Sequence, residues 1–169
     1  MPATPPRPLQ MDVDTTHFDC GNESINRWLQ RHAWNNHEDG ISRASVICDS
    51  ANGALIGFVT LSSAQIERAF LPKSQQRNRP DPMPVTLLGR LAISISHQGQ
   101  GHAWSLLRYA LQMALHASRD VGSFGVITHP INDTVRAFYA RWDFEDLPFD
   151  PHRTMLVRMA ELRRSGLGD

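Results

Sequence analysis

The fold is decided by one stretch of sequence, Leu91-Ala92-Ile93-Ser94-Ile95-Ser96-His97-Gln98-Gly99-Gln100-Gly101-His102-Ala103. It predicts an apolar strand that runs into a glycine-rich turn and then into an amphipathic helix. A helix N-terminus leaves backbone N–H groups without partners and carries the positive end of the helix dipole, so it stabilises an anion without a cationic side chain. Gly99 and Gly101 let the backbone turn sharply and approach a ligand closely. The turn is therefore interpreted either as a pyrophosphate cradle or as a turn that only closes a loop.

The helix that follows the turn presents one apolar face. Its apolar residues recur at spacings of three and four, as in a helix that packs on a sheet; they are Ala103, Leu106, Leu107, Ala110, Leu111, Ala114 and Leu115. Upstream, residues 18–29 predict a turn and then a helix that fades by Asn35. Residues 45–48 and 54–66 predict an antiparallel hairpin, because Asn52-Gly53 between them supplies the positive φ of a tight turn.

The remaining elements complete an α/β pattern. The proline-rich residues 71–84 predict an extended loop, and the apolar residues 85–96 predict a central strand covered on both faces. Residues 125–128 and 154–159 predict strands on either side of a short helix at 132–142. An antiparallel start followed by alternating strands and helices predicts a mixed α/β sheet with helices on both faces.

Composition agrees with one domain over residues 1–169. The hydrophobic fraction of 41% and the charged fraction of 20% are ordinary for a globular protein. We expect the proline-rich residues 1–10 to be flexible. They lack the apolar run of a signal peptide, and no stretch of the sequence is long and apolar enough to span a membrane, so we expect a cytoplasmic protein. Cys20 and Cys48 predict free thiols rather than a disulfide, and the histidines show no paired ligand spacing, so no metal site is expected.

Charge is unevenly distributed although the formal net charge is zero. Asp81 is the only acidic residue between Arg68 and Arg119, a segment whose basic residues are Arg68, Lys73, Arg77, Arg79, Arg90, Arg108 and Arg119. This segment predicts either a basic face for a phosphate backbone or an anionic cofactor, or charges dispersed over a solvated surface.

The segment Gln98-Gly99-Gln100-Gly101-His102-Ala103 resembles the Gln/Arg-x-x-Gly-x-Gly/Ala signature of the GNAT acyl-CoA-dependent N-acyltransferases. The family's second feature also has a counterpart, because Asn132 precedes Tyr139 by seven residues and Phe144 follows. The sequence departs from that pattern at Val135, where a small residue is usual, and at Asp143, where the family has glycine.

The resemblance implies a mixed, mostly antiparallel GNAT sheet and acetyl-CoA as the acetyl donor. It implies that the backbone of Leu91, Ala92 and Ile93 pairs with the pantetheine arm and polarises the thioester carbonyl, and that residues 98–103 hold the pyrophosphate. It places Asn132 and Phe138 at the cofactor and makes Tyr139 the general acid that protonates the departing sulfur. The alternative for Tyr139 is a ring that only packs in a helix.

A closer resemblance covers nearly the whole chain. It is carried by Phe18-Asp19-Cys20-Gly21 before Trp28-Leu29, by Gly57-Phe58, by Arg77 in a loop ending Pro80-Asp81-Pro82-Met83-Pro84-Val85, and by Leu88-Gly89-Arg90-Leu91-Ala92-Ile93. Together these segments are similar to the GNAT toxins of type II toxin–antitoxin modules. That family implies acetylation of the α-amine of aminoacyl-tRNA, blocked translation, a ribbon–helix–helix antitoxin and a homodimer.

Three arginines are candidates for contacting tRNA phosphates, namely Arg77, Arg79 and Arg90. Arg90 is equally a candidate for bracing its loop through an internal ion pair.

The absence of a carboxylate near the predicted site limits which kind of amine can be the acceptor. Residues 82–119, which include the central strand and the long helix, contain no Asp or Glu and so offer no acidic general base. An α-amine, with a pKa of about 7.7 to 8.0, is partly neutral near pH 7, whereas a lysine amine at about 10.4 is not. An α-amine acceptor therefore fits an active site without an acidic general base. Water or His129 could relay the proton, and the alternative for His129 is a structural role. The alternatives are a GNAT enzyme for a small amine or a protein N-terminus, and a cofactor-binding regulatory module without turnover.

Overall fold

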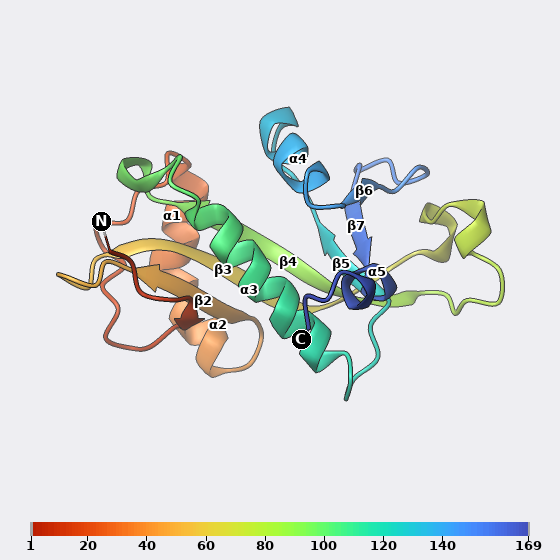
Figure 1. Cartoon of the computed structure of the whole chain (residues 1–169), viewed down its shortest axis with the longest axis horizontal. Helices are drawn as coiled ribbons and strands as arrows, with labels where there is room; N and C mark the ends of the chain where they lie inside the picture. The colour runs from red at the N-terminus through yellow and green to blue at the C-terminus, as the bar shows by residue number, and fades with distance from the viewer. Residues whose placement is uncertain (1, 169) are drawn as a thin grey trace. The chain divides into compact units, whose positions relative to one another are not determined.

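The computed structural model describes residues 2–168, which fold as two compact units. The first contains Met1–Ser62 and Leu88–Ala110, and the second contains Ser63–Leu87 and Leu111–Asp169. The seven strands follow the order β1-β2-β3-β4-β5-β7-β6, and all the strand pairs described below are antiparallel except β4 with β5 (Figure 1). The predicted mixed, mostly antiparallel sheet is confirmed.

In the first unit, β1 (Arg7–Pro8), β2 (Arg43–Cys48) and β3 (Leu55–Ile66) pair antiparallel, with β1 at the sheet edge. The predicted hairpin between β2 and β3 is present, and Gly53 in its turn has a φ of +75°. We expected residues 1–10 to be flexible. In the structure, the Thr4 N–H donates to the Cys48 carbonyl at 2.8 Å and the Leu9 N–H donates to the Ala44 carbonyl at 2.9 Å, which joins this segment to β2.

One helical stretch lies beside β2 and contains a widened turn (Figure 1). It consists of α1 (Glu23–Trp28), the π-helical segment η1 (Leu29–Ala33) and α2 (Trp34–Glu38). The Asn22 side chain starts it by accepting the Ile25 N–H at 3.2 Å. The stretch continues past the predicted end near Asn35, because Trp34 packs against the core and the His37 Nδ1 atom accepts the Ala44 N–H at 3.0 Å.

The central strand β4 (Met83–Ile93) begins at Met83, within the predicted loop, and ends before the predicted end at Ser96. Its predicted final part is instead the 3-10 turn η4 (Ile95–His97), because the Ser94 N–H donates to the Ile56 carbonyl and the Ile95 N–H donates to the Asp19 carbonyl. The helix α3 (His102–Ala117) then follows. Its predicted apolar face is confirmed, since all its members except Ala103 are buried: Leu106, Leu107, Ala110, Leu111, Ala114 and Leu115.

The second unit contains β5 (Gly125–Thr128), α4 (Asp133–Ala140), β6 (Glu145–Asp146), β7 (Met155–Arg158) and α5 (Met159–Arg164). β4 pairs with β5 in parallel, and β5 pairs with β7 antiparallel. The bounds of β5 are those predicted, whereas α4 is shorter at both ends than the predicted helix. The sequence did not predict β6 or α5. The predicted loop before β4 contains the 3-10 turn η3 (Lys73–Gln75), and a second 3-10 turn, η2 (Arg68–Phe70), lies just before the loop.

Across residues 2–168, none of the helices combines the length and apolarity that a bilayer crossing requires.

Candidate active site

The turn before α3 has the backbone conformation that glycine favours. Gly99 has a φ of +77° and Gly101 a φ of +87°, both in the left-handed region. A Cβ built on either residue meets no heavy atom within 4 Å. Backbone conformation, not crowding, therefore requires glycine here, and space is left on the open side of the turn.

A row of backbone donors lies along this turn and the first turn of α3. Within the described residues, the N–H groups of Gly99, Gln100, Gly101, His102 and Ala103 have no hydrogen-bond partner. All five residues are exposed or half-exposed. Free amides at the N-terminus of a helix this long suit a diphosphate, because they donate directly to it while the helix dipole stabilises its charge.

The Gln98 side chain braces the turn from inside. Its Nε2 donates to the Ile93 carbonyl at 3.0 Å and to the Cys20 carbonyl at 3.3 Å. The Cys20 N–H in turn donates to Oδ1 of the buried Asn26, whose amide donates to Asp19. Donation from the Gly21 N–H, and then from Asn26, lowers the pKa of Asp19. The loop before α1 thus anchors the turn, a support that sequence analysis missed because it joins segments distant along the chain.

The end of β4 is tied to the same turn through Ile93. Across from it lies Gly57 on β3, where an added Cβ would lie 2.5 Å from Ile93 Cδ1 and 2.8 Å from the Ala92 carbonyl oxygen. Only glycine lets β3 approach β4 this closely. Ala92 and Ile93, at the end of β4, are thereby held close to β3, directly after Leu91.

Tyr139 lies on α4 in the second unit and is 3% exposed. Its ring packs between Phe138 and Phe144, with centroid distances of 5.3 and 5.1 Å. Burial raises the pKa of Tyr139 to about 12, against a smaller opposite effect of its hydrogen bond with Thr128. The phenol keeps its proton at neutral pH, as a tyrosine with its ordinary pKa near 10 also does. Sequence analysis did not identify Thr128 as its partner.

Asn132 is the N-cap of α4, because its Oδ1 accepts the Val135 N–H at 2.8 Å. Its side-chain amide nitrogen is the group left for a ligand. Asp143, where the related family has glycine, adopts a φ of +71°, so the turn keeps the left-handed conformation that glycine would give. His129 is hydrogen-bonded through Nδ1 to the Thr154 hydroxyl at 3.1 Å, which agrees with a structural role.

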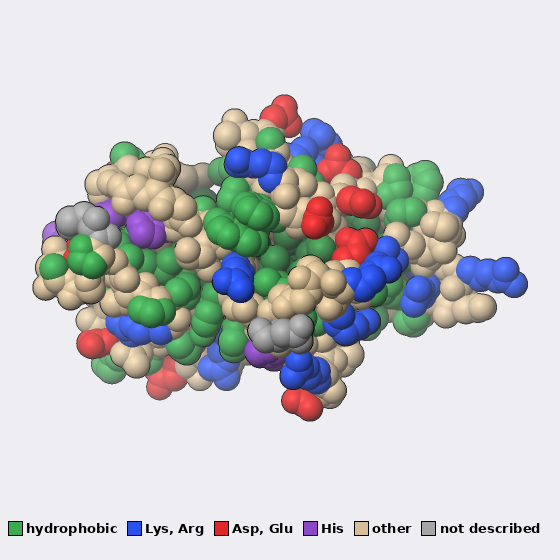
Figure 2. All heavy atoms as spheres, viewed as in Figure 1, with side chains coloured by type: hydrophobic (Ala, Val, Ile, Leu, Met, Phe, Trp, Pro, Cys, Tyr) green, Lys and Arg blue, Asp and Glu red, His purple; other side chains and the backbone are tan. Residues whose placement is uncertain are grey.

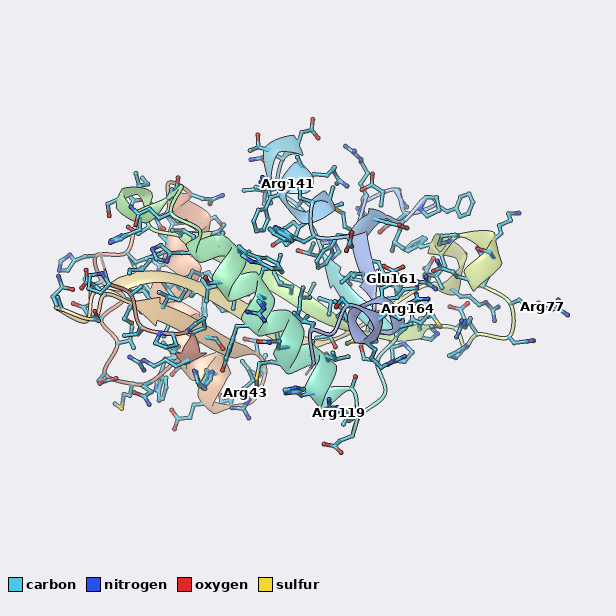
Figure 3. The ribbon with its side chains drawn as sticks, viewed as in Figure 1. Arg43, Arg77, Arg119, Arg141, Glu161 and Arg164 are labelled. Atoms are coloured by element: carbon cyan, nitrogen blue, oxygen red, sulfur yellow. The ribbon has the colours of Figure 1, made fainter. Side chains whose placement is uncertain are left out.

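The three predicted tRNA-binding arginines have different environments. Arg90, in the first unit, lies over the Trp28 ring at 3.9 Å from its centroid, and no carboxylate of residues 2–168 forms the alternative ion pair with it. Arg79, in the second unit, lies over Phe124 at 5.2 Å. Arg77 is exposed and points outward from the loop (Figure 3), at the end of the molecule where Figure 2 shows projecting Lys and Arg side chains.

Within residues 2–168 no group of three or more His, Cys, Asp or Glu side chains is arranged to hold a metal ion. Cys20 and Cys48 are free thiols, the first half-buried and the second buried.

Comparison with known proteins identifies what the chain resembles as a whole. Residues 13–144 match the acetyltransferase (GNAT) family. The chain is 38% identical over 152 residues, 90% of each protein, to a tRNA-acetylating toxin of Mycobacterium tuberculosis. It matches the structure of AtaT complexed with acetyl-methionyl-tRNAfMet at a TM-score of 0.89 and 31% identity, covering 98% of this chain and 99% of that one. It also matches a tyrosine-to-phenylalanine mutant of AtaT bound to the C-terminus of the antitoxin AtaR and acetyl-CoA, at a TM-score of 0.81 and 28% identity, over 97% and 98% of the two chains.

Proposed function

We propose that this chain, which belongs to the GNAT acetyltransferase family, is a toxin that transfers acetyl from acetyl-CoA to the α-amine of aminoacyl-tRNA and so blocks translation. The observation that carries the proposal is the row of free amides at Gly99–Ala103 in a chain 38% identical to a tRNA-acetylating toxin. The free amides fit the diphosphate of the acetyl donor, acetyl-CoA, and the identity to the toxin indicates a tRNA as the acceptor.

Acetyl-CoA supplies an activated acetyl thioester. The amides of residues 99–103 hold its diphosphate, with Gln98 keeping the turn in shape. The backbone of Leu91, Ala92 and Ile93 pairs with the amides of the pantetheine arm and polarises the thioester carbonyl. Asn132, through its side-chain nitrogen, and Phe138 hold the cofactor arm.

Tyr139 is the general acid of the proposed reaction. Its phenol is protonated throughout the neutral range, as a tyrosine with its ordinary pKa near 10 also is, and burial raises the pKa further, to about 12. It hands the Oη proton to the departing sulfur and recovers a proton that the acceptor amine releases to solvent. No carboxylate from residues 82–119 is needed as a base, because an α-amine is already partly neutral near pH 7.

The acceptor is recognised partly through its phosphates. Arg77, Arg79 and Arg90 supply charge-assisted donors, and Arg77 is the most freely extended of the three. The proposal includes a ribbon–helix–helix antitoxin, a homodimer and a cytoplasmic location, which follow from the toxin family rather than from a contact seen in this chain. AtaT, a structural relative, is bound to the C-terminus of its antitoxin.

Radiolabelled acetyl-CoA distinguishes the proposed acceptor from the alternative, a small amine or a protein N-terminus. The purified protein is incubated with total charged tRNA, with the same tRNA after deacylation, and with a pool of small amines and peptides. We expect label in RNA only when the tRNA is charged, and recovery of the label as an N-acetyl amino acid after mild alkaline hydrolysis. Label that enters small amines or peptides but not charged tRNA would favour the alternative.

A further inference from the structure

Three planar side chains contact one another in sequence in the first unit, Arg90 with Trp28 and Trp28 with Phe58. The guanidinium of Arg90 lies 3.9 Å from the centroid of the Trp28 ring, and that ring stacks on Phe58 at 6.1 Å with an interplanar angle of 11°. Phe58 is fully buried in the core. Trp28 therefore contacts the guanidinium through a cation–π interaction, while its own ring is held by the stacking on Phe58.

The backbone beneath Arg90 is fixed as well. The Arg90 N–H donates to the hydroxyl of the buried Thr60 at 3.1 Å. The preceding residue is Gly89, where an added Cβ would come within 3.0 Å of the same oxygen. The backbone of β4 is therefore fixed at Arg90, directly before Leu91–Ile93, the segment proposed to hold the thioester.

Among residues 2–168, no carboxylate serves as a counter-ion for Arg90. Arg27, Arg136, Arg153 and Arg158 each lie within 4.0 Å of a carboxylate, whereas no carboxylate of residues 2–168 lies that close to Arg90. Burial lowers the pKa of Arg90, so its charge is partly desolvated. A guanidinium binds through donors in its own plane, and a ring stacked on its face leaves that plane open to an external anion.

We infer that Trp28 is a positioning residue for the acceptor: it holds the Arg90 guanidinium flat, with its in-plane N–H donors ready for a phosphate of the RNA. The identity of the RNA rests on the proposed function. A planar guanidinium held in this way binds a phosphate through two parallel hydrogen bonds, which a freely rotating arginine forms only after losing conformational entropy.

The test measures the salt dependence of tRNA binding by the full-length protein. Dissociation constants for deacylated tRNA are determined by fluorescence anisotropy at several NaCl concentrations for the wild type, Trp28→Leu, Trp28→Phe, Arg90→Gln and the Trp28→Leu/Arg90→Gln double variant. Each lost phosphate contact reduces the slope of log K against log salt by about 0.7 to 0.9. We expect that reduction for Trp28→Leu and for Arg90→Gln, no further reduction in the double variant, and a wild-type slope for Trp28→Phe, which keeps a ring face.

A purely structural role for Trp28 predicts a different pattern. Trp28→Leu would then lower the melting temperature but keep the wild-type slope, and that result would overturn the inference; so would an unchanged slope in Arg90→Gln or additive losses in the double variant. Should Trp28→Leu fail to fold, Trp28→Met, which also lacks a ring, replaces it. Acetylation of charged tRNA by the wild type is measured in parallel. Its absence would sink the proposed function, whereas the slopes with deacylated tRNA judge the role of Trp28 separately.

Discussion

Replacing Tyr139 by Phe removes a single oxygen from the proposed general acid. The ring stays between Phe138 and Phe144, because their contacts do not involve the hydroxyl. The hydrogen bond with Thr128 is lost, which destabilises the fold by about 1 kcal/mol. Loss of a general acid slows turnover by about 100- to 10,000-fold. Since each tenfold change in rate corresponds to about 1.4 kcal/mol, the barrier rises by about 3 to 5 kcal/mol.

Turnover is followed as CoA release at saturating acetyl-CoA and aminoacyl-tRNA. The dissociation constant for acetyl-CoA and the melting temperature are measured on the same preparations. The dissociation constant is expected to stay near the wild-type value, and the melting temperature is expected to fall by about 2 to 4 °C. Tyr109→Phe is the matched control, because Tyr109 is the other tyrosine of the chain and lies within α3. A Tyr139→Phe protein that keeps kcat within about threefold of the wild type would remove Tyr139 from acid catalysis, since such a change is far below the expected loss.

Three further outcomes are expected from the geometry. Gly101→Ala forces a residue with a side chain into a φ of +87°, which costs a strain of about 1 to 2 kcal/mol. The dissociation constant for acetyl-CoA, measured by calorimetry, is therefore expected to rise about tenfold. The control Gly122→Ala, where φ is not left-handed, leaves this constant unchanged. Gly125→Ala places a Cβ 2.4 Å from the Val157 carbonyl oxygen and destabilises the fold by about 1 to 3 kcal/mol or more; a wild-type urea midpoint would contradict this clash. Burial raises the pKa of Tyr139 to about 12 from an unfolded value near 10, so the unfolded chain releases this proton first. The contribution of the protonated Tyr139 to the free energy of unfolding is fully present below pH 10 and is lost as the pH rises towards 12, by about 3 kcal/mol. Urea midpoints should therefore fall less steeply with pH in Tyr139→Phe than in the wild type.

Local signals predicted the parts of this fold that depend on local physics. The apolar face of α3 follows directly from side-chain periodicity, and the bounds of β5 follow from a short, fully buried run of residues. Gly53 turns the chain where Asn-Gly predicts a turn. The glycine turn before α3 was found for the same reason, since left-handed backbone is encoded by the residue that adopts it.

Features that depend on distant partners were not predictable in this way. β1 and β6 contain two residues each, too few for an alternating pattern, and each exists because a longer strand offers it hydrogen bonds. The end of β4 is set by carbonyls of Ile56 and Asp19, which no local signal near Ser94 reveals. Arg90 was a candidate for an ion pair, but its contact is with Trp28, which the sequence shows only as an inward-facing residue of a helix.

The widened turn at Leu29–Ala33 allows this helical stretch to lose one residue without displacing the residues beyond it. A π turn accommodates one residue more than an α turn, and each residue of an α-helix advances about 100° around the axis. Deleting one residue here would therefore convert the segment to regular α-helix and leave the residues beyond it in register, with Trp34 against the core and the His37 Nδ1 atom accepting the Ala44 N–H at 3.0 Å. A regular α-helix could not absorb the same deletion, because the residues beyond it would rotate by about 100°. We therefore expect one-residue alignment gaps in this part of the family to collect within residues 29–33.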